Sequence, residues 1–185
     1  ATRGYRWITD DVPPADAGLG RDISRVDVLE GYAGALYIGF AVPGAGAQIW
    51  RSTTGDLGSW QRSSPDSFGA RSTGRFISDA AVAAHDGLYV AALDETLGVT
   101  VWRTRDGAGW EQVAPTGFGS PANIAAELIA FGGSIYAWTT NYASGQGVWR
   151  GEVIPRNHLT TTPSDRYTAL SDPALARTAA PDGPP

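Results

Sequence analysis

The chain has 185 residues, among them 24 Gly, 12 Pro and 7 Trp, and it carries a formal net charge of −5. This length and composition predict one domain rich in short strands and turns. The 14 basic residues are all arginine and offer no basic patch, which argues against nucleic acid as a partner, and the absence of cysteine excludes a disulfide framework and a thiolate metal site.

The first predicted strand lies in GYRWITDDV, residues 4–12, an outer-strand piece that contains Trp7. The chain starts at Ala1 without an initiator Met or an apolar leader, which fits a matured secreted protein or a piece of a longer one. The longest apolar run, residues 123–131, carries Glu127, so we expect no membrane-spanning segment.

Several residue types recur at one spacing along the chain. The Trp-Arg pairs are separated by 52 and 47 residues, and a series of tyrosines keeps the same two steps. Independent markers that share a period of about fifty residues indicate repeated architecture. The series are Trp50-Arg51, Trp102-Arg103 and Trp149-Arg150; Tyr37, Tyr89 and Tyr136; Trp7, Trp60 and Trp110; and Phe68-Gly69 and Phe118-Gly119.

Each repeat is predicted to contain four short strands. In the middle repeat these are residues 77–86, 87–94, 99–106 and 109–115, with Gly, Asp or Pro at every join. The first strand is rich in alanine, which suits the innermost strand of a propeller blade. A helix over residues 121–133 is the alternative, but the equivalent stretch of the first repeat is rich in β-branched residues and favours a strand. Four strands per fifty residues predict an all-β fold of β-propeller blades.

Asp106-Gly107 stands between two predicted strands, where the aspartate can accept hydrogen bonds from turn amides and the glycine supplies a positive φ. Trp110 then leads the outer strand, where its large side chain can pack between blades. This stretch resembles the Asp-box of sialidase-type propellers, Ser/Thr-x-Asp-x-Gly-x-x-Trp. Thr104, Asp106 and Trp110 are the matching positions, with one residue fewer between Asp and Trp.

In the upstream copy, STTGDLGSW, either Thr54 stands at the Asp position or the turn is rearranged around Asp56. The box of sialidase families is a structural turn away from the active site, which implies structural roles here for Thr104, Asp106, Gly107, Trp60 and Trp110. Over residues 1 to about 153, the chain looks like the Trp-Arg-Ser/Thr-x-Asp-Gly-x-x-Trp repeats of bacterial secreted propellers of the sialidase-like, kelch-like group. That likeness implies an extracytoplasmic location and surface recognition more than catalysis.

The strands of residues 1–154 amount to three blades if the segment 4–12 completes the last repeat. Propellers have four to eight blades, so three cannot close a ring. Either two copies form a six-bladed ring, or the remaining blades belong to another polypeptide, or the open blades lean on a partner. Each option requires a further protein surface.

The tail, residues 155–185, is rich in Pro, Thr and Ala and lacks the Gly-aromatic pattern. We expect it to lie along its own propeller or, preferably, along a neighbouring subunit, with one short helical turn capped by Ser171. The residues proposed for docking are Pro155, His158, Tyr167, Leu170 and Leu175.

Hydrolysis of the sialidase type would need three clustered arginines, a Tyr nucleophile with a Glu partner and an acid/base Asp. Arg51, Arg103 and Arg150 recur in phase, which favours pairing with carboxylates or carbonyls of neighbouring blades over catalysis. His85, in a predicted turn, and His158 lack metal-ligand spacing. The acidic pairs Asp10-Asp11 and Asp94-Glu95 are expected to be solvated, with calcium binding as an alternative. No cofactor or metal site is predicted.

Three functions remain. The preferred function is that of a non-enzymatic, extracytoplasmic structural subunit of a larger assembly. That assembly is either peripheral to a membrane or not associated with a membrane. The second is a carbohydrate-binding lectin formed by oligomerisation, and the third is a fragment of a glycoside hydrolase. Partly exposed indoles would favour the lectin. Its ligand-binding residues would be Trp50, Arg51, Trp102, Arg103, Trp149 and Arg150.

Overall fold

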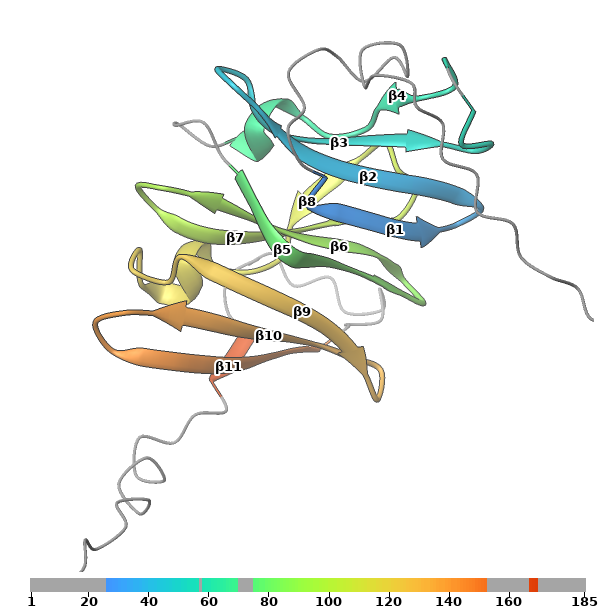
Figure 1. Ribbon diagram of the computed structural model, residues 1–185. Coiled ribbons are helices and arrows are strands. Elements are labelled where there is room, and N and C mark those ends of the chain that lie inside the picture. The colour runs from blue at the N-terminus through green and yellow to red at the C-terminus, as the bar shows by residue number, and fades with distance from the viewer. Residues whose placement is uncertain (1–25, 57, 70–74, 153–166, 170–185) are drawn as a thin grey trace, which may run out of the picture.

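The computed structural model describes residues 26–56, 58–69, 75–152 and 167–169. These residues form three four-stranded antiparallel sheets stacked one on the next (Figure 1). The predicted all-β fold of three four-stranded propeller blades is therefore confirmed. Blade 1 is β1 (Val28–Tyr32), β2 (Ala35–Val42), β3 (Gly46–Ser52) and β4 (Gln61–Arg62); blade 2 is β5 (Arg75–Ala84), β6 (Gly87–Asp94), β7 (Gly98–Thr104) and β8 (Trp110–Gln112); blade 3 is β9 (Ala125–Phe131), β10 (Ser134–Asn141), β11 (Gly145–Glu152) and β12 (Tyr167–Ala169).

The strands of blade 2 follow the predicted order and nearly the predicted limits. The turn between β5 and β6 contains His85, which is exposed as expected of a hairpin residue. Asp94 was expected to be solvated, but it is buried at the end of β6. Its Oδ1 accepts hydrogen bonds from the amides of Thr96 (2.8 Å) and Leu97 (3.1 Å), so the carboxylate caps the turn into β7.

The hydrophobic cores lie between blades. One core joins Tyr37 and Ile49 of blade 1 to Leu88 and Val90 of blade 2, and a second joins blade 2 to blade 3. The first strands of neighbouring blades, β1, β5 and β9, contact one another, as expected of the innermost position (Figure 1). Each blade thus buries its apolar side chains by stacking on its neighbour.

A short 3₁₀ turn after the outer strand inserts a phenylalanine into each of the two blade junctions. These turns are η1 (Asp66–Gly69) and η2 (Thr116–Gly119), the repeated Phe-Gly of the sequence. Phe68 and Phe118 adopt positive φ values of 50° and 49°, which point their rings at the next blade. Phe118 lies 5.1 Å from the Trp149 ring, and Phe68 lies 5.6 Å from the Trp102 ring.

The outer strand of blade 3 differs from the prediction. We expected residues 4–12 to complete this blade, but β12 from the tail pairs with β11 there. Tyr167 stands opposite Gly151, just as Trp110 stands opposite Thr104 in blade 2. Tyr167 therefore takes, in blade 3, the position at the start of the outer strand that Trp110 holds in blade 2. Residues 4–12, with Trp7, lie outside the described residues.

Most of the tail also lies outside the described residues, including Pro155, His158, Leu170 and Leu175. Tyr167 is described through its backbone pairing in β12. In the described part of the chain, no helix is long and apolar enough to span a membrane.

Candidate functional site

The turn between β7 and β8 contains the Asp-box-like stretch, and its side chains accept hydrogen bonds from amides of the same turn. The Thr104 Oγ1 accepts a hydrogen bond from the Gly107 amide at 2.9 Å. The Asp106 Oδ1 accepts two more, from the amides of Ala108 and Gly109, each at 2.8 Å. These amides, with Ala108 contributing most, hold the pKa of Asp106 below its usual value. Side chains thus satisfy the turn amides, and the turn carbonyls are left to point outward.

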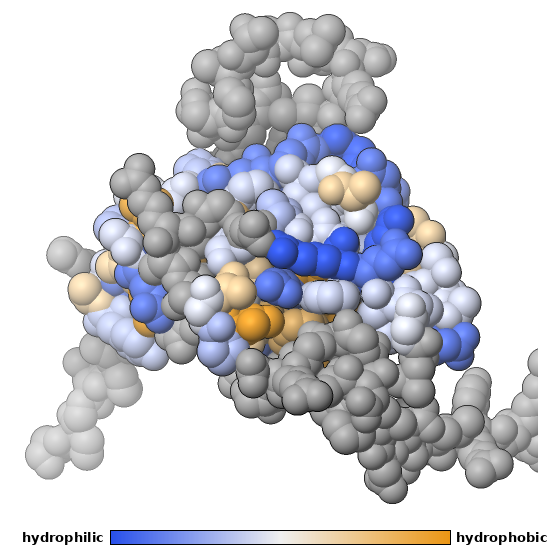
Figure 2. Space-filling view, turned by 90° about the horizontal axis from the view of Figure 1, so that it is seen from above, coloured by the Kyte–Doolittle hydropathy of each residue, from blue (hydrophilic) through white to orange (hydrophobic). Residues whose placement is uncertain are grey.

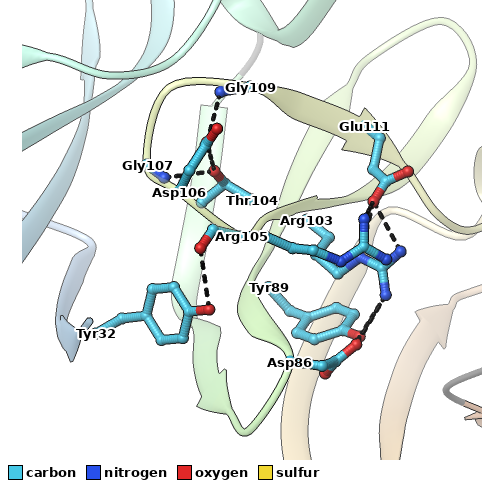
Figure 3. Close-up of polar contacts among 10 residues, drawn as sticks. All are labelled: Tyr32, Asp86, Tyr89, Arg103, Thr104, Arg105, Asp106, Gly107, Gly109 and Glu111. Atoms are coloured by element: carbon cyan, nitrogen blue, oxygen red, sulfur yellow. Dashed lines mark hydrogen bonds and ion pairs between the residues drawn. The ribbon is translucent and has the colours of Figure 1, made fainter. Parts of the chain in front are cut away.

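Blade 1 donates to three successive carbonyl groups of that turn, an arrangement we name the clasp. Figure 3 shows the first donor, Tyr32, which approaches the turn from β1. A hydroxyl, a guanidinium and a second hydroxyl make the three contacts, so the turn of one blade is fixed to the blade before it. The contacts are Tyr32 Oη to the Arg105 carbonyl (3.2 Å), Arg51 Nη1 to the Asp106 carbonyl (2.9 Å) and Ser63 Oγ to the Gly107 carbonyl (2.7 Å).

Trp110 reinforces the same junction. Its indole Nε1 donates to the Ser63 carbonyl at 3.0 Å, and its ring meets the Phe68 ring edge-on at 5.3 Å. In blade 1, the Ser52 Oγ accepts hydrogen bonds from the amides of Thr54 (3.1 Å) and Gly55 (2.7 Å), so Ser52 occupies the position of Thr104.

The upstream turn replaces the aspartate of the box by a threonine. The Thr54 Oγ1 accepts from the Asp56 amide at 3.2 Å, as Asp106 accepts from Ala108 two residues on. Thr54 therefore stands at the Asp position, the first of the two alternatives drawn from the sequence. Trp60, which follows the turn, is half-buried.

The junction between blades 2 and 3 has no counterpart of the clasp among the described residues. Gly151 takes the register position of Thr104, so blade 3 lacks the first box residue. Blade 2 also lacks two of the donors: Ala84 holds the position of Tyr32, and Val113 that of Ser63. The first box residue of blade 3 and two of the donors of blade 2 are thus both absent. Apolar contacts such as that of Phe118 with Trp149 hold this junction instead.

The three repeated tryptophans have partners within their own blades. Each indole Nε1 donates to a side-chain oxygen nearby, and all three rings are half-buried. Trp102 and Trp149 also pack against the phenylalanine of the preceding blade. The contacts are Trp50 to Gln48 Oε1 (3.0 Å), Trp102 to Thr100 Oγ1 (3.0 Å) and Trp149 to Thr139 Oγ1 (2.9 Å).

The repeated arginines are used differently in each blade. Arg51 donates to a carbonyl of the next blade, as the sequence suggested. Arg103 instead pairs within its own blade, with Asp86 (2.8 Å) and Glu111 (2.7 Å), because Glu111 lies directly across the strand pair. Arg105 reaches the same Glu111 oxygen at 2.8 Å (Figure 3). Arg150 is half-buried in β11.

Tyr89, on β6, also contacts this group of charged side chains. Its hydroxyl donates to the Asp86 carboxylate at 3.0 Å, and the Arg103 guanidinium lies 5.7 Å from the ring centre. Burial raises the pKa of Tyr89 to about 12. A hydroxyl held in its neutral form is poorly suited to act as a nucleophile at neutral pH.

We expect Tyr89 to make folding stability fall at alkaline pH. Its folded pKa of about 12 lies above the ordinary tyrosine value of 10.0, so its contribution to stability is complete below pH 10 and is lost as the pH rises through 12. Denaturant unfolding between these pH values should show a steeper decline for the wild-type protein than for Tyr89→Phe. Equal slopes would contradict the assignment.

Blade 3 exposes its forward face, the side that in blades 1 and 2 packs on the next blade. Tyr136 and Val148 occupy the register of Tyr89 and Val101, which are buried in blade 2. Four large apolar side chains of this face are open to solvent. They are Phe131 at 73% exposure, Ile129 at 62%, Trp138 at 42% and Val148 at 41%.

The far end of the stack presents a different surface. Figure 2 views the molecule from the blade 1 side, where a band of hydrophilic residues borders an apolar group near the middle. Ile38 and Phe40 of β2 are buried, and Phe40 stacks on Trp50 at 6.4 Å. In the described residues, no three His, Cys, Asp or Glu side chains are grouped to hold a metal ion.

Sequence inspection missed the residues that act through contacts outside the repeat. Blade 2 has Ala84 and Val113 at the positions of Tyr32 and Ser63, so no periodic signal marked these two residues. Glu111 had a usable signal, because it follows Trp110 in a strand predicted to pair with the strand of Arg103.

No family model matches the chain, and no curated protein matches it in sequence. Among solved structures, the GH32 beta-fructofuranosidase BmSUC1 of Bombyx mori is similar in fold, with a TM-score of 0.48 and 12% identity. The match covers 80% of this chain and 34% of that chain, so the chain spans about a third of that enzyme's length.

Proposed function

We propose that the chain is a non-enzymatic interaction module that docks on a protein partner through the forward face of blade 3. The observation that carries this proposal is the exposure of Trp138 and Val148 at positions that are buried in the two preceding blades. Ile129 and Phe131 are exposed beside them on the same face. Soluble domains rarely leave such a face open unless another protein covers it. An extracytoplasmic location is part of the proposal, supported by the likeness of the Trp-Arg repeats to those of bacterial secreted propellers.

The contacts around the arginines support a role without catalysis. Arg103 is paired with two carboxylates, and Arg51 is bound to a turn of the next blade, so neither guanidinium is arranged with the other to clamp a substrate carboxylate. Tyr89, beside Arg103, has a pKa that burial raises to about 12, so its hydroxyl is neutral. A glycoside hydrolase would need its catalytic groups from elsewhere.

Carbohydrate binding is the second candidate. Trp138 offers a partly exposed indole, and Glu127 stands beside it on the neighbouring strand. An indole with an adjacent carboxylate can stack on a sugar ring and accept its hydroxyl hydrogen bonds.

The native mass of the full chain, isolated from its source under mild conditions, tests the proposed function. We expect a complex larger than 19.4 kDa. Phe131→Ser should dissociate this complex, while Leu97→Ser, at an exposed site in a turn of blade 2, should leave the complex intact. A chain that runs as a monomer in the extract would contradict the proposal. Binding on a glycan array that Trp138→Ser abolishes would favour the lectin instead.

A further inference from the structure

The forward face of blade 3 departs from the repeat in a consistent way. Where blade 1 has Gly39 and blade 2 has Ala91, blade 3 has Trp138. Across the strand pair, Glu127 takes the position of the buried Val28. Small and apolar residues let the earlier blades approach closely, whereas a protruding indole and a charge do not. This face is therefore shaped for a surface other than another blade of the repeat.

The residues of this face form an ordered grid. Tyr136 and Trp138 lie along the central strand, β10. Ile129 and Glu127 flank them on β9, and Arg150 and Val148 flank them on β11. Glu127 stands beside Trp138 and Arg150 beside Tyr136, so the acid and the base lie on opposite sides of β10, one row apart. Aromatic residues in the centre, with charges at the rim, are typical of protein interfaces.

This grid is complementary to itself. A two-fold axis running nearly along β10 would lay the Tyr136–Trp138 stripe of one copy on that of another. The same rotation exchanges β9 and β11, the two strands that flank β10, which brings Glu127 of one copy towards Arg150 of the other. Isologous interfaces need only one such patch, and two-fold dimers are the commonest oligomers. Packed sheets accept this arrangement at a modest angle between their strands.

A head-to-tail arrangement has less support. It would place blade 1 of one copy on blade 3 of the other, but Ile38 is 6% exposed and Phe40 is fully buried on that side of blade 1. Blade 3 also has Phe131 at the position of Tyr32, so it lacks the hydroxyl that a box-bearing blade receives in the clasp.

We infer that the partner covering the forward face of blade 3 is a second copy of the same chain, packed face to face about a two-fold axis. This inference rests on the proposed function and names the partner of the same surface. The predicted product is a dimer with Trp138 at its centre and Glu127 at its rim.

Sedimentation of the purified full chain from about 1 µM to about 1 mM tests this inference. We expect the mass to rise with concentration from 19.4 kDa towards twice that value. Trp138→Ser should raise the dissociation constant at least about tenfold. Glu127→Arg, at an exposed site where folding is not at risk, should also raise it, because two arginines would then approach each other.

Leu29→Ser is the matched control, since Leu29 is 66% exposed but lies on β1 of blade 1. Its dissociation constant should equal that of the wild-type protein. Weakening by Leu29→Ser without an effect of Trp138→Ser would overturn the face-to-face arrangement. A monomer throughout the purified series, together with a larger complex in the source extract, would refute the second copy but not the proposed function. A monomer in both would refute both.

Discussion

The Gly107→Ala variant is expected to unfold at a temperature about 10 °C below that of the wild-type protein, equivalent to a loss of about 3–4 kcal/mol. Gly107 has a φ of 73°, which costs alanine about 1 kcal/mol or more. A Cβ atom there would also collide with the Tyr37 hydroxyl and lie 2.7 Å from the Arg51 Nη1. The turn would have to move off blade 1, which breaks the clasp.

Two glycine variants separate the causes in this experiment. Gly55 has the same place in the turn of blade 1 and a φ of 80°, but a Cβ there meets nothing within 4 Å. Gly55→Ala should therefore cost only the backbone strain, about 1–2 kcal/mol. Gly109→Ala should be close to neutral, because its nearest atom would be 3.8 Å away. If thermal unfolding shows equal losses for Gly107→Ala and Gly55→Ala, the clasp contributes nothing to stability.

Replacing Phe118 by alanine is expected to remove about 3–5 kcal/mol and to loosen blade 3 more than the other blades. Phe118 is buried and fills the junction with Trp149, where the described residues provide no clasp as a second attachment. Hydrogen exchange measured by mass spectrometry should show lost protection in β10 and β11, with β2 and β6 less affected.

Phe68→Ala is the matched variant at the other junction. Phe68 holds the same position beside Trp102, but the clasp also ties blades 1 and 2 together there. We expect a similar loss of global stability, while the exchange rates of blades 1 and 2 rise together. Protection lost equally in all three blades of Phe118→Ala would show that the junctions do not differ.

Much of the fold could be predicted because the residue types that recur in the repeat are those that strands and turns require. The limits predicted for β6, residues 87–94, are those observed, since Gly and Asp mark both ends. The position of β12 could not be found in the same way. Its strand starts with Tyr167 where the other blades have Trp, and it follows a longer connection, so the spacing that identified the blades fails there.

The proposed interaction surface was harder to predict than the fold. Ligand binding by the repeated Trp-Arg pairs stays a prediction, and the structure shows that each indole N–H donates a hydrogen bond within its own blade. Trp138 was overlooked because it is a departure from the repeat inside a predicted strand. The sequence already showed a tryptophan two residues after the repeated tyrosine, where the other repeats have Gly39 and Ala91, and strand register confirms that these positions are equivalent.

The box residues of a blade occur together with hydrogen-bond donors on the blade before it, and this pairing restricts the order in which the blades can follow one another. A blade with Thr104 and Asp106 in its turn needs a predecessor that offers groups like those of Tyr32 and Ser63, while a blade without the box can follow Ala84 and Val113. Blades of this chain are therefore not interchangeable units. Consider an engineered array in which a copy of blade 2 directly follows another blade 2. The turn of the second copy would need three hydrogen-bond donors, but the first copy would offer only Arg103. Hydroxyl side chains would therefore have to be introduced at positions 84 and 113.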